Sequence, residues 1–247
     1  MSRDTVTGVN PIAETRYGKI RGTLEDGLCV FRGVPYAEPP VGARRFRAPQ
    51  APEPWPGVRD AGSFGAPAPQ IPGMLARLLG SDTDRASEDC LTLNLWTPAL
   101  DEGRRPVMVW IHGGSFTSGT AGSPIYDGSS LARRGDVVVV TFNYRLGALG
   151  FLALSRFEEE DGVLGNLGLL DQIALLEWVK EHITRFGGDP ECVTVFGESA
   201  GAMSAGTLLG VPRARGLLRR AVLQSRTVSD VQLMAILSPV EESDEVE

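Results

Sequence analysis

Apolar residues gather in four short runs in the middle of the chain. Each run is largely β-branched with few polar positions, which is typical of strands buried on both faces of a sheet. The runs cover Leu91–Trp96, Val107–Ile111, Val137–Phe142 and Val193–Phe196. They predict the central strands of a single sheet.

A different spacing precedes the last of these strands. Leu169, Ile173, Leu176 and Val179 lie three or four positions apart, which predicts an amphipathic helix that ends at the Gly187–Pro190 segment. Strands that alternate with helices in this way predict the α/β class, with a doubly wound, mostly parallel sheet.

The first 70 residues are richer in Pro, Gly and Arg. Short alternating runs over residues 15–20 and 29–34 predict short strands and an antiparallel hairpin, followed by a proline-braced loop over residues 35–56. Near the other end, Ala221–Ser225 predicts one more strand.

The sequence closes on carboxylates, which dominate residues 241–247. Such a stretch is too polar to join a packed core, so it is expected to be disordered. We therefore expect one domain over residues 1–235 and an acidic tail over residues 236–247.

Composition limits the possible partners. With 42% hydrophobic and 22% charged residues the chain is typical of a soluble globular protein, and a net charge of -7 argues against nucleic acids and anionic membranes. No apolar run is long enough to span a bilayer and the start lacks the pattern of a secretory signal, so we expect a cytoplasmic protein. Cys29, Cys90 and Cys192 form no CxxC pair, and no cofactor or metal motif is found, so reduced thiols are expected.

The sharpest motif is Phe196-Gly197-Glu198-Ser199-Ala200-Gly201-Ala202, a G-x-S-x-G placed after a predicted strand and before a helix-compatible run. In such a nucleophile elbow the serine lies on a strained turn, and small flanking glycines let strand and helix approach each other. Ser199 is the candidate nucleophile. The alternative is a structural Gly-Ser turn.

A second motif follows another predicted strand. Trp110-Ile111-His112-Gly113-Gly114-Ser115-Phe116 matches the HGG-type loop that supplies oxyanion-hole donors in hydrolases with this elbow. We assign the backbone N–H groups of Gly114, Ser115 and Ala200 as donors, and Gly113 as the residue that permits the turn. The alternative is a glycine-rich turn that binds nothing.

Several segments together resemble one family, the type-B carboxylesterases and cholinesterase-like proteins, from about residue 14 to Ser225. Besides the elbow, the matching segments in order are Phe31–Pro40, Ser87–Asn94, Trp110–Phe116, Asn143–Gly147 and Phe186–Pro190. The resemblance implies an α/β-hydrolase fold and the hydrolysis of a small carboxylic ester through an acyl-serine intermediate at Ser199.

Two further features are implied by the resemblance alone. One is a supporting ion pair between Arg45 and Glu88. The other concerns Cys90, which some family members pair in a disulfide with the position that Ala68 occupies here. Cys90 is therefore expected to be a free thiol.

The pattern of this family is incomplete in one respect. Hydrolases of this fold place nucleophile, acid and histidine in that chain order, whereas the two histidines here, His112 and His182, both precede Ser199. Both are interpreted as satisfied structural histidines. Because a serine hydroxyl is a poor nucleophile without a base, weak or absent activity is expected unless a base is supplied.

Family members continue beyond the end of this sequence, so the fold is expected to be C-terminally truncated and to lack its last strands. An exposed sheet edge near Val222 would then favour association. A non-catalytic, esterase-like interaction protein is the alternative function.

Overall fold

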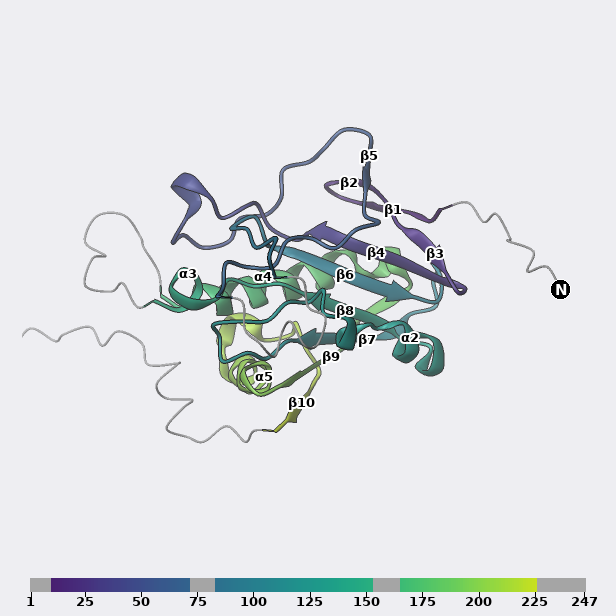
Figure 1. Cartoon of the computed structure of the whole chain (residues 1–247). Helices are drawn as coiled ribbons and strands as arrows, with labels where there is room; N and C mark the ends of the chain where they lie inside the picture. The colour runs from purple at the N-terminus through teal and green to yellow at the C-terminus, as the bar shows by residue number, and fades with distance from the viewer. Residues whose placement is uncertain (1–9, 72–82, 153–164, 226–247) are drawn as a thin grey trace, which may run out of the picture.

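The computed structural model describes residues 10–71, 83–152 and 165–225. Within these ranges a seven-stranded sheet forms the centre, in the order β10-β9-β7-β8-β6-β4-β3 (Figure 1). The strands are β3 (Thr23–Glu25), β4 (Leu28–Pro35), β6 (Thr92–Thr97), β7 (Arg105–Ile111), β8 (Val138–Phe142), β9 (Gly188–Glu198) and β10 (Arg220–Gln224). All the strands predicted from apolar runs are present. The predicted acidic tail lies outside the described residues.

The sheet is mixed rather than mostly parallel. The pairs β10/β9, β9/β7 and β7/β8 are parallel, whereas β8/β6, β6/β4 and β4/β3 are antiparallel. The reason lies in the connections, because a parallel pair needs a crossover while β3 and β4 are joined by the tight turn at Asp26 and Gly27. The sequence pattern reports burial of each strand but not its direction.

A second, smaller sheet holds β1 (Ile12–Thr15), β2 (Gly18–Arg21) and β5 (Val58–Asp60). β1 and β2 form the predicted N-terminal antiparallel hairpin. The run over residues 15–20 is not one strand, however, because the chain turns at Arg16 and Tyr17. The hydroxyl of Thr15 accepts a hydrogen bond from the Tyr17 N–H at 3.2 Å, which closes this turn.

Helices lie on both faces of the large sheet (Figure 1). They are α2 (Ser129–Gly135), α3 (Gly147–Phe151), α4 (Leu167–His182) and α5 (Ala200–Gly210), with short 3-10 turns η1 (Gly42–Arg44), η2 (Pro124–Tyr126), η4 (Ile183–Phe186) and η5 (Pro212–Ala214). The larger core cluster joins α4 and α5 to one face, and a smaller cluster joins α2 to the other through Ala132, Trp96 and Val139. Alternate residues of β8 belong to the two clusters, as strand geometry requires.

Helix α4 includes the predicted helix but is buried over more of its surface than an amphipathic pattern implies. Asp171, Gln172 and His182 are buried together with the apolar positions. The helix is enclosed because the N-terminal hairpin lies against its C-terminal end, where the rings of Tyr17 and His182 are 5.2 Å apart. The helical segment continues through η4 and ends at Gly187, which has φ 75.

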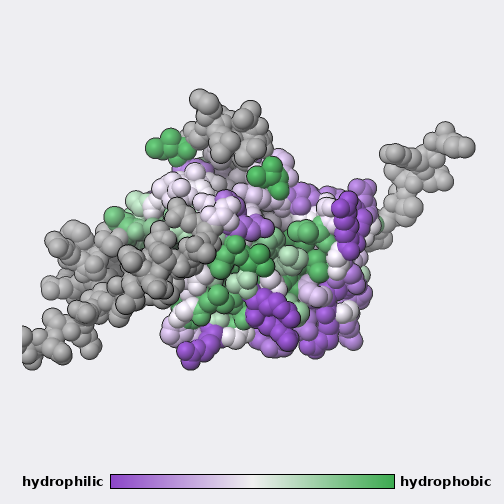
Figure 2. Space-filling model, turned by 90° about the horizontal axis from the view of Figure 1, so that it is seen from below, coloured by the Kyte–Doolittle hydropathy of each residue, from purple (hydrophilic) through white to green (hydrophobic). Residues whose placement is uncertain are grey.

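On the face of the sheet that carries α2, the described elements leave Val222 of β10 exposed and Phe196 of β9 partly exposed. Trp110 of β7 is covered, since it is 9% exposed and packs against Tyr126 of η2 with ring centroids 5.1 Å apart. Trp110, Phe196 and Val222 are register partners across these three parallel strands, so their side chains share this face. Trp110 and Phe196 line a shallow cavity of about 190 Å³, and Val222 is 46% exposed. Figure 2 shows apolar side chains gathered on this side of the molecule.

Candidate active site

Ser199 lies at the sharp connection between β9 and α5. Its backbone has φ 55 and ψ -117, a region that residues other than glycine seldom adopt. The Ser199 N–H donates to the carbonyl of Gln224 at 3.1 Å, and the Ser199 carbonyl accepts from the Met203 N–H at 3.0 Å. The strained turn is therefore held by β10 on one side and by the first turn of α5 on the other.

The two glycines of the elbow are required by close backbone contacts. A Cβ atom on Gly197 would lie 2.5 Å from the carbonyl carbon of Gly201, and one on Gly201 would lie 2.0 Å from the carbonyl oxygen of Ile111. Contacts this short force neighbouring backbone to move. The sequence reasoning that glycines let strand and helix approach is confirmed at both positions.

The HGG loop begins where β7 ends, directly beside the elbow. Ile111 and Gly197 are register partners on β7 and β9, so the carboxyl ends of both strands meet at one edge of the sheet. A Cβ atom on Gly113 would lie 2.8 Å from the Glu198 carbonyl oxygen and 3.4 Å from the Ser199 Cβ. The fold thus places Gly113 in contact with the turn at Ser199, although 85 residues lie between the two in sequence.

The backbone of the HGG loop has unusual dihedral angles and leaves some of its N–H groups without a hydrogen bond. Gly114, Ser115 and Phe116 have φ of 113, 53 and 60, and the Gly114 carbonyl accepts from the N–H groups of Thr117 and Ser118, both at 3.0 Å. Among the described residues, the N–H groups of Gly114, Ser115 and Ala200 donate no hydrogen bond. Donors left open in this way can receive a ligand oxygen.

His112 begins the loop, but its side chain lies in the interior. The ring is 1% exposed, stacks on Tyr144 with centroids 4.5 Å apart, and makes an Nδ1 hydrogen bond to the Gly113 carbonyl at 2.8 Å. Burial lowers the pKa of His112 to about 4, so the ring is neutral at pH 7. Its Nε2 has no hydrogen-bond partner among the described residues, and the ring therefore does not contact Ser199 as a base.

His182 ends α4 far from the elbow. Its Nδ1 bonds to the Trp178 carbonyl at 3.0 Å, its ring stacks on Trp178, and burial lowers its pKa. Both histidines are structural, as predicted. Within the described residues, each ring makes a hydrogen bond through Nδ1 and none through Nε2.

A buried ion pair behind the site was missed by sequence reasoning. Arg145 donates from Nε and Nη2 to the carboxylate of Asp171 at 2.8 and 2.6 Å, and its backbone N–H donates to the same carboxylate at 3.0 Å. The two side chains are 3% and 0% exposed. Arg145 belongs to the Asn143–Gly147 motif, so the motif gave a signal, but its partner on α4 could be found only in three dimensions.

The two expectations carried by family resemblance alone are met. Arg45 Nη2 lies 2.5 Å from Glu88 Oε1, and Arg45 Nε lies 2.6 Å from Glu88 Oε2. Cys90 is a free, fully buried thiol whose pKa is raised by burial, and Ala68 is buried in the same core cluster. Cys29 and Cys192 are free as well.

Within the described ranges, no group of three or more His, Cys, Asp or Glu side chains is arranged to hold a metal ion. None of the helices in those ranges is long and apolar enough to cross a membrane.

The strand β9, the strained turn at Ser199, helix α5 and the adjoining glycine loop are arranged as in the α/β-hydrolase fold. The sequence model of the Carboxylesterase family matches residues 9–241, and the chain belongs to this family. It is 53% identical over 214 residues to the para-nitrobenzyl esterase of Bacillus subtilis (strain 168), covering 87% of this chain and 43% of that protein. It is 51% identical over 218 residues to the phenmedipham hydrolase of Pseudarthrobacter oxydans, again covering 87% of this chain and 43% of the relative.

Solved structures agree with this assignment. A thermophilic para-nitrobenzyl esterase superposes with a TM-score of 0.83 at 50% identity, covering 92% of this chain and 47% of that one. A Geobacillus stearothermophilus carboxylesterase superposes with a TM-score of 0.79 at 52% identity, covering 85% of this chain and 42% of that one. The chain thus spans less than half the length of the esterases that it matches.

Proposed function

We propose that this chain supplies the nucleophile and the oxyanion hole of a carboxylic ester hydrolase. The observation that carries the proposal is the backbone of Ser199, strained at φ 55 and ψ -117 between β9 and α5, with the Gly113 turn in contact with it. Ordinary serine turns have no need of this strain, whereas a nucleophile elbow requires it.

In the proposed reaction, the Ser199 hydroxyl attacks the carbonyl carbon of a small ester. The oxygen of the tetrahedral intermediate becomes negative and accepts hydrogen bonds from the N–H groups of Gly114, Ser115 and Ala200. Collapse of the intermediate breaks the ester C–O bond and releases the alcohol, which takes a proton, and leaves an acyl-serine. Water then attacks the acyl-serine, releasing the acid and restoring the hydroxyl.

The proton of the Ser199 hydroxyl needs an acceptor, and the two histidines of this sequence do not provide one. The His112 ring makes its only described hydrogen bond to Gly113, and His182 lies at the other end of α4. We therefore assign the general base to a residue outside the described ranges. Without it, the elbow and oxyanion hole should retain only a small part of the activity.

An added base tests this assignment directly. Hydrolysis of p-nitrophenyl acetate is measured with and without imidazole, for the wild-type chain, for Ser199→Ala and for Ser130→Ala, which changes an exposed serine of α2. Because imidazole also cleaves this ester in solution, the relevant quantity is the difference from Ser199→Ala at equal imidazole concentration. We expect imidazole to raise a Ser199-dependent rate that Ser130→Ala leaves unchanged.

A fluorophosphonate probe gives a second readout of the same site. We expect labelling that Ser199→Ala abolishes. A folded chain that shows neither labelling nor an imidazole-dependent rate would overturn the proposal. That result would favour a non-catalytic interaction protein, which the exposed apolar surface around Val222 would suit.

A further inference from the structure

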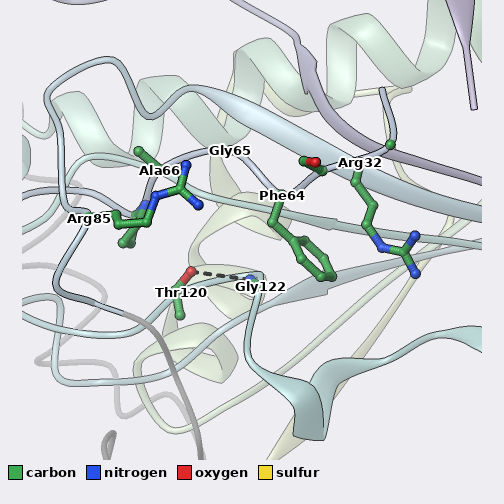
Figure 3. A pocket seen from close by; sticks show the side chains of 10 residues that line it. Arg32, Phe64, Gly65, Ala66, Arg85, Thr120 and Gly122 are labelled. Atoms are coloured by element: carbon green, nitrogen blue, oxygen red, sulfur yellow. Dashed lines mark hydrogen bonds between the residues drawn. The ribbon is translucent and has the colours of Figure 1, made fainter. Parts of the chain in front are cut away.

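A pocket of about 400 Å³ lies beside the chain segment that follows the oxyanion loop (Figure 3). Its volume falls in the range of small-molecule sites. Four parts of the chain that are separate in sequence form its walls. The lining residues are Arg32, Gly62, Ser63, Phe64, Gly65, Ala66, Pro67, Arg85, Thr120 and Gly122.

The walls of this pocket are held together before any ligand binds. The side chain of Asn143 donates to the Ala66 carbonyl at 3.0 Å and accepts from the Ala121 N–H at 2.8 Å, so one buried amide joins two walls. The Thr120 hydroxyl accepts from the Gly122 N–H at 3.1 Å. A pocket fixed in this way loses little conformational freedom on binding.

The lining is positive although the chain carries a net charge of -7. It holds two arginines and no carboxylate. Arg32 is neutralised by Glu25, with Nη2 to Oε2 at 2.7 Å and Nη1 to Oε1 at 2.5 Å, and its guanidinium stacks on the Phe64 ring at 5.1 Å. Arg32 therefore fixes the Phe64 wall and is not the free charge of the pocket.

The free charge belongs to Arg85. The Arg85 side chain is exposed, and its guanidinium makes no ion pair or hydrogen bond with any described residue. In Figure 3 this side chain points towards Gly65, and Phe64 lies between the two arginines. The pocket thus offers one unpaired guanidinium next to one aromatic ring.

We propose that this pocket binds a small organic carboxylate with an apolar body, the carboxylate on Arg85 and the apolar part against Phe64. A guanidinium fits a carboxylate through two parallel hydrogen bonds. A monoanion is favoured over a dianion such as phosphate because only one positive charge is unpaired, while Glu25 and Asp127 both act on Arg32 electrostatically. The site is separate from Ser199, so the inference does not depend on the proposed hydrolysis.

Benzoate is the probe, and benzamide is its neutral counterpart of the same shape. Binding is measured by the shifts of backbone amide signals in two-dimensional NMR, where Gly62, Gly65 and Gly122 report on the pocket walls. We expect benzoate at millimolar concentration to shift these signals. Benzamide should bind at least about ten-fold more weakly, because it cannot form the charge-assisted hydrogen bonds with Arg85.

Two arginine variants locate the interaction. Arg85→Gln should weaken benzoate binding about ten-fold or more, and Arg85→Lys should restore part of it. Arg59→Gln is the matched control, since Arg59 is also an exposed arginine beside an aromatic ring, 4.4 Å from Trp55, but lies in another pocket. Each of the three variants should bind benzoate as tightly in the Ser199→Ala background as it does with Ser199 present.

Equal binding of benzoate and benzamide, or unchanged benzoate binding by Arg85→Gln, would overturn the proposal. So would shifts confined to the surroundings of Ser199. Tighter binding of inorganic phosphate than of benzoate at the same signals would assign the pocket to a different anion.

Discussion

Backbone strain and crowding meet at the residues around Ser199. The turn adopts φ 55 only because the hydrogen bonds of its N–H to Gln224 and of its carbonyl to Met203 fix it on both sides. Gly197 and Gly201 permit this packing because they have no side chain, and a side chain at either position would collide with neighbouring backbone. At this scale, the conformation of the turn depends on close packing of the backbone.

Gly201→Ala tests that packing. The new Cβ would lie 2.0 Å from the Ile111 carbonyl oxygen, so α5 must move away from β7. We expect urea unfolding to show a loss of about 1–3 kcal/mol, typical of overpacking, together with reduced fluorophosphonate labelling. Gly135→Ala is the control, because its Cβ would meet only Val137 at 3.4 Å, and it should change stability by less than about 1 kcal/mol. Equal behaviour of the two variants would contradict this account.

His112 should make stability depend on pH. Its folded-state pKa of about 4 lies below the ordinary 6.5, so the unfolded chain binds more protons than the folded chain between these values. Stability should therefore rise with pH from about 4 to about 6.5 and level off above, with a contribution of up to about 3 kcal/mol from this ring.

The measurement is urea unfolding at several pH values across that window. His112→Gln should have a shallower pH dependence than the wild type. His182→Gln should remove a separate contribution of the same sign, because burial also lowers the pKa of His182. An unaltered pH dependence in His112→Gln would exclude the explanation.

At the scale of elements, α4 is fixed to the sheet by charge as well as by apolar packing. Asp171 on α4 holds Arg145, which follows β8, and Arg145 Nη1 also donates to the Arg47 carbonyl at 2.8 Å. One buried arginine thus connects the helix, the strand end and the proline-braced loop. All three elements support the edge of the sheet where the elbow lies.

Asp171→Asn should be strongly destabilising. It leaves Arg145 buried without a counter-charge, which typically costs about 3–5 kcal/mol. Glu177→Gln provides a matched comparison on the same helix, because it breaks the exposed Glu177–Arg213 pair, whose side chains are 43% and 52% exposed. That change should cost less than about 1 kcal/mol. Denaturant unfolding measures the loss of stability in both variants. Similar losses would show that burial does not determine how much an ion pair contributes here.

At the scale of the whole molecule, the two faces of the large sheet are covered to different extents. The face under α4 and α5 is filled by the main core cluster, whereas on the other face Phe196 is only partly buried and Val222 is 46% exposed. Among the described residues, β10 is also the outermost strand at its end of the sheet. An apolar face beside an unpaired strand edge favours association.

Val222→Lys should therefore weaken self-association of the chain. Lysine on an edge strand opposes edge-to-edge pairing, and here it would also interrupt the apolar face. In sedimentation velocity over a range of concentrations, we expect larger species for the wild type and fewer for Val222→Lys. Val41→Lys, which changes a comparably exposed valine outside the sheet, should behave as the wild type. A wild-type chain that stays monomeric throughout would refute the prediction.

Much of this arrangement follows from the sequence because its causes are local. β-branched runs, glycine pairs and the serine between Gly197 and Gly201 act through neighbours along the chain, so the strands, the helix and the tight turn at Ser199 could be predicted. Strand direction could not, because burial alone does not distinguish parallel from antiparallel neighbours. The enclosure of α4 also escaped prediction, since its second covering comes from the hairpin at Tyr17.

Only the tertiary structure decided which distant groups meet. It brought Gly113 to Ser199, paired Arg145 with Asp171, and placed Arg85 and Phe64 in one pocket. Each of these depends on loops whose course is set by long-range packing, and such contacts have no periodicity along the chain. The sequence by itself determined the chemistry that is available, and the fold determined which of those groups can act together.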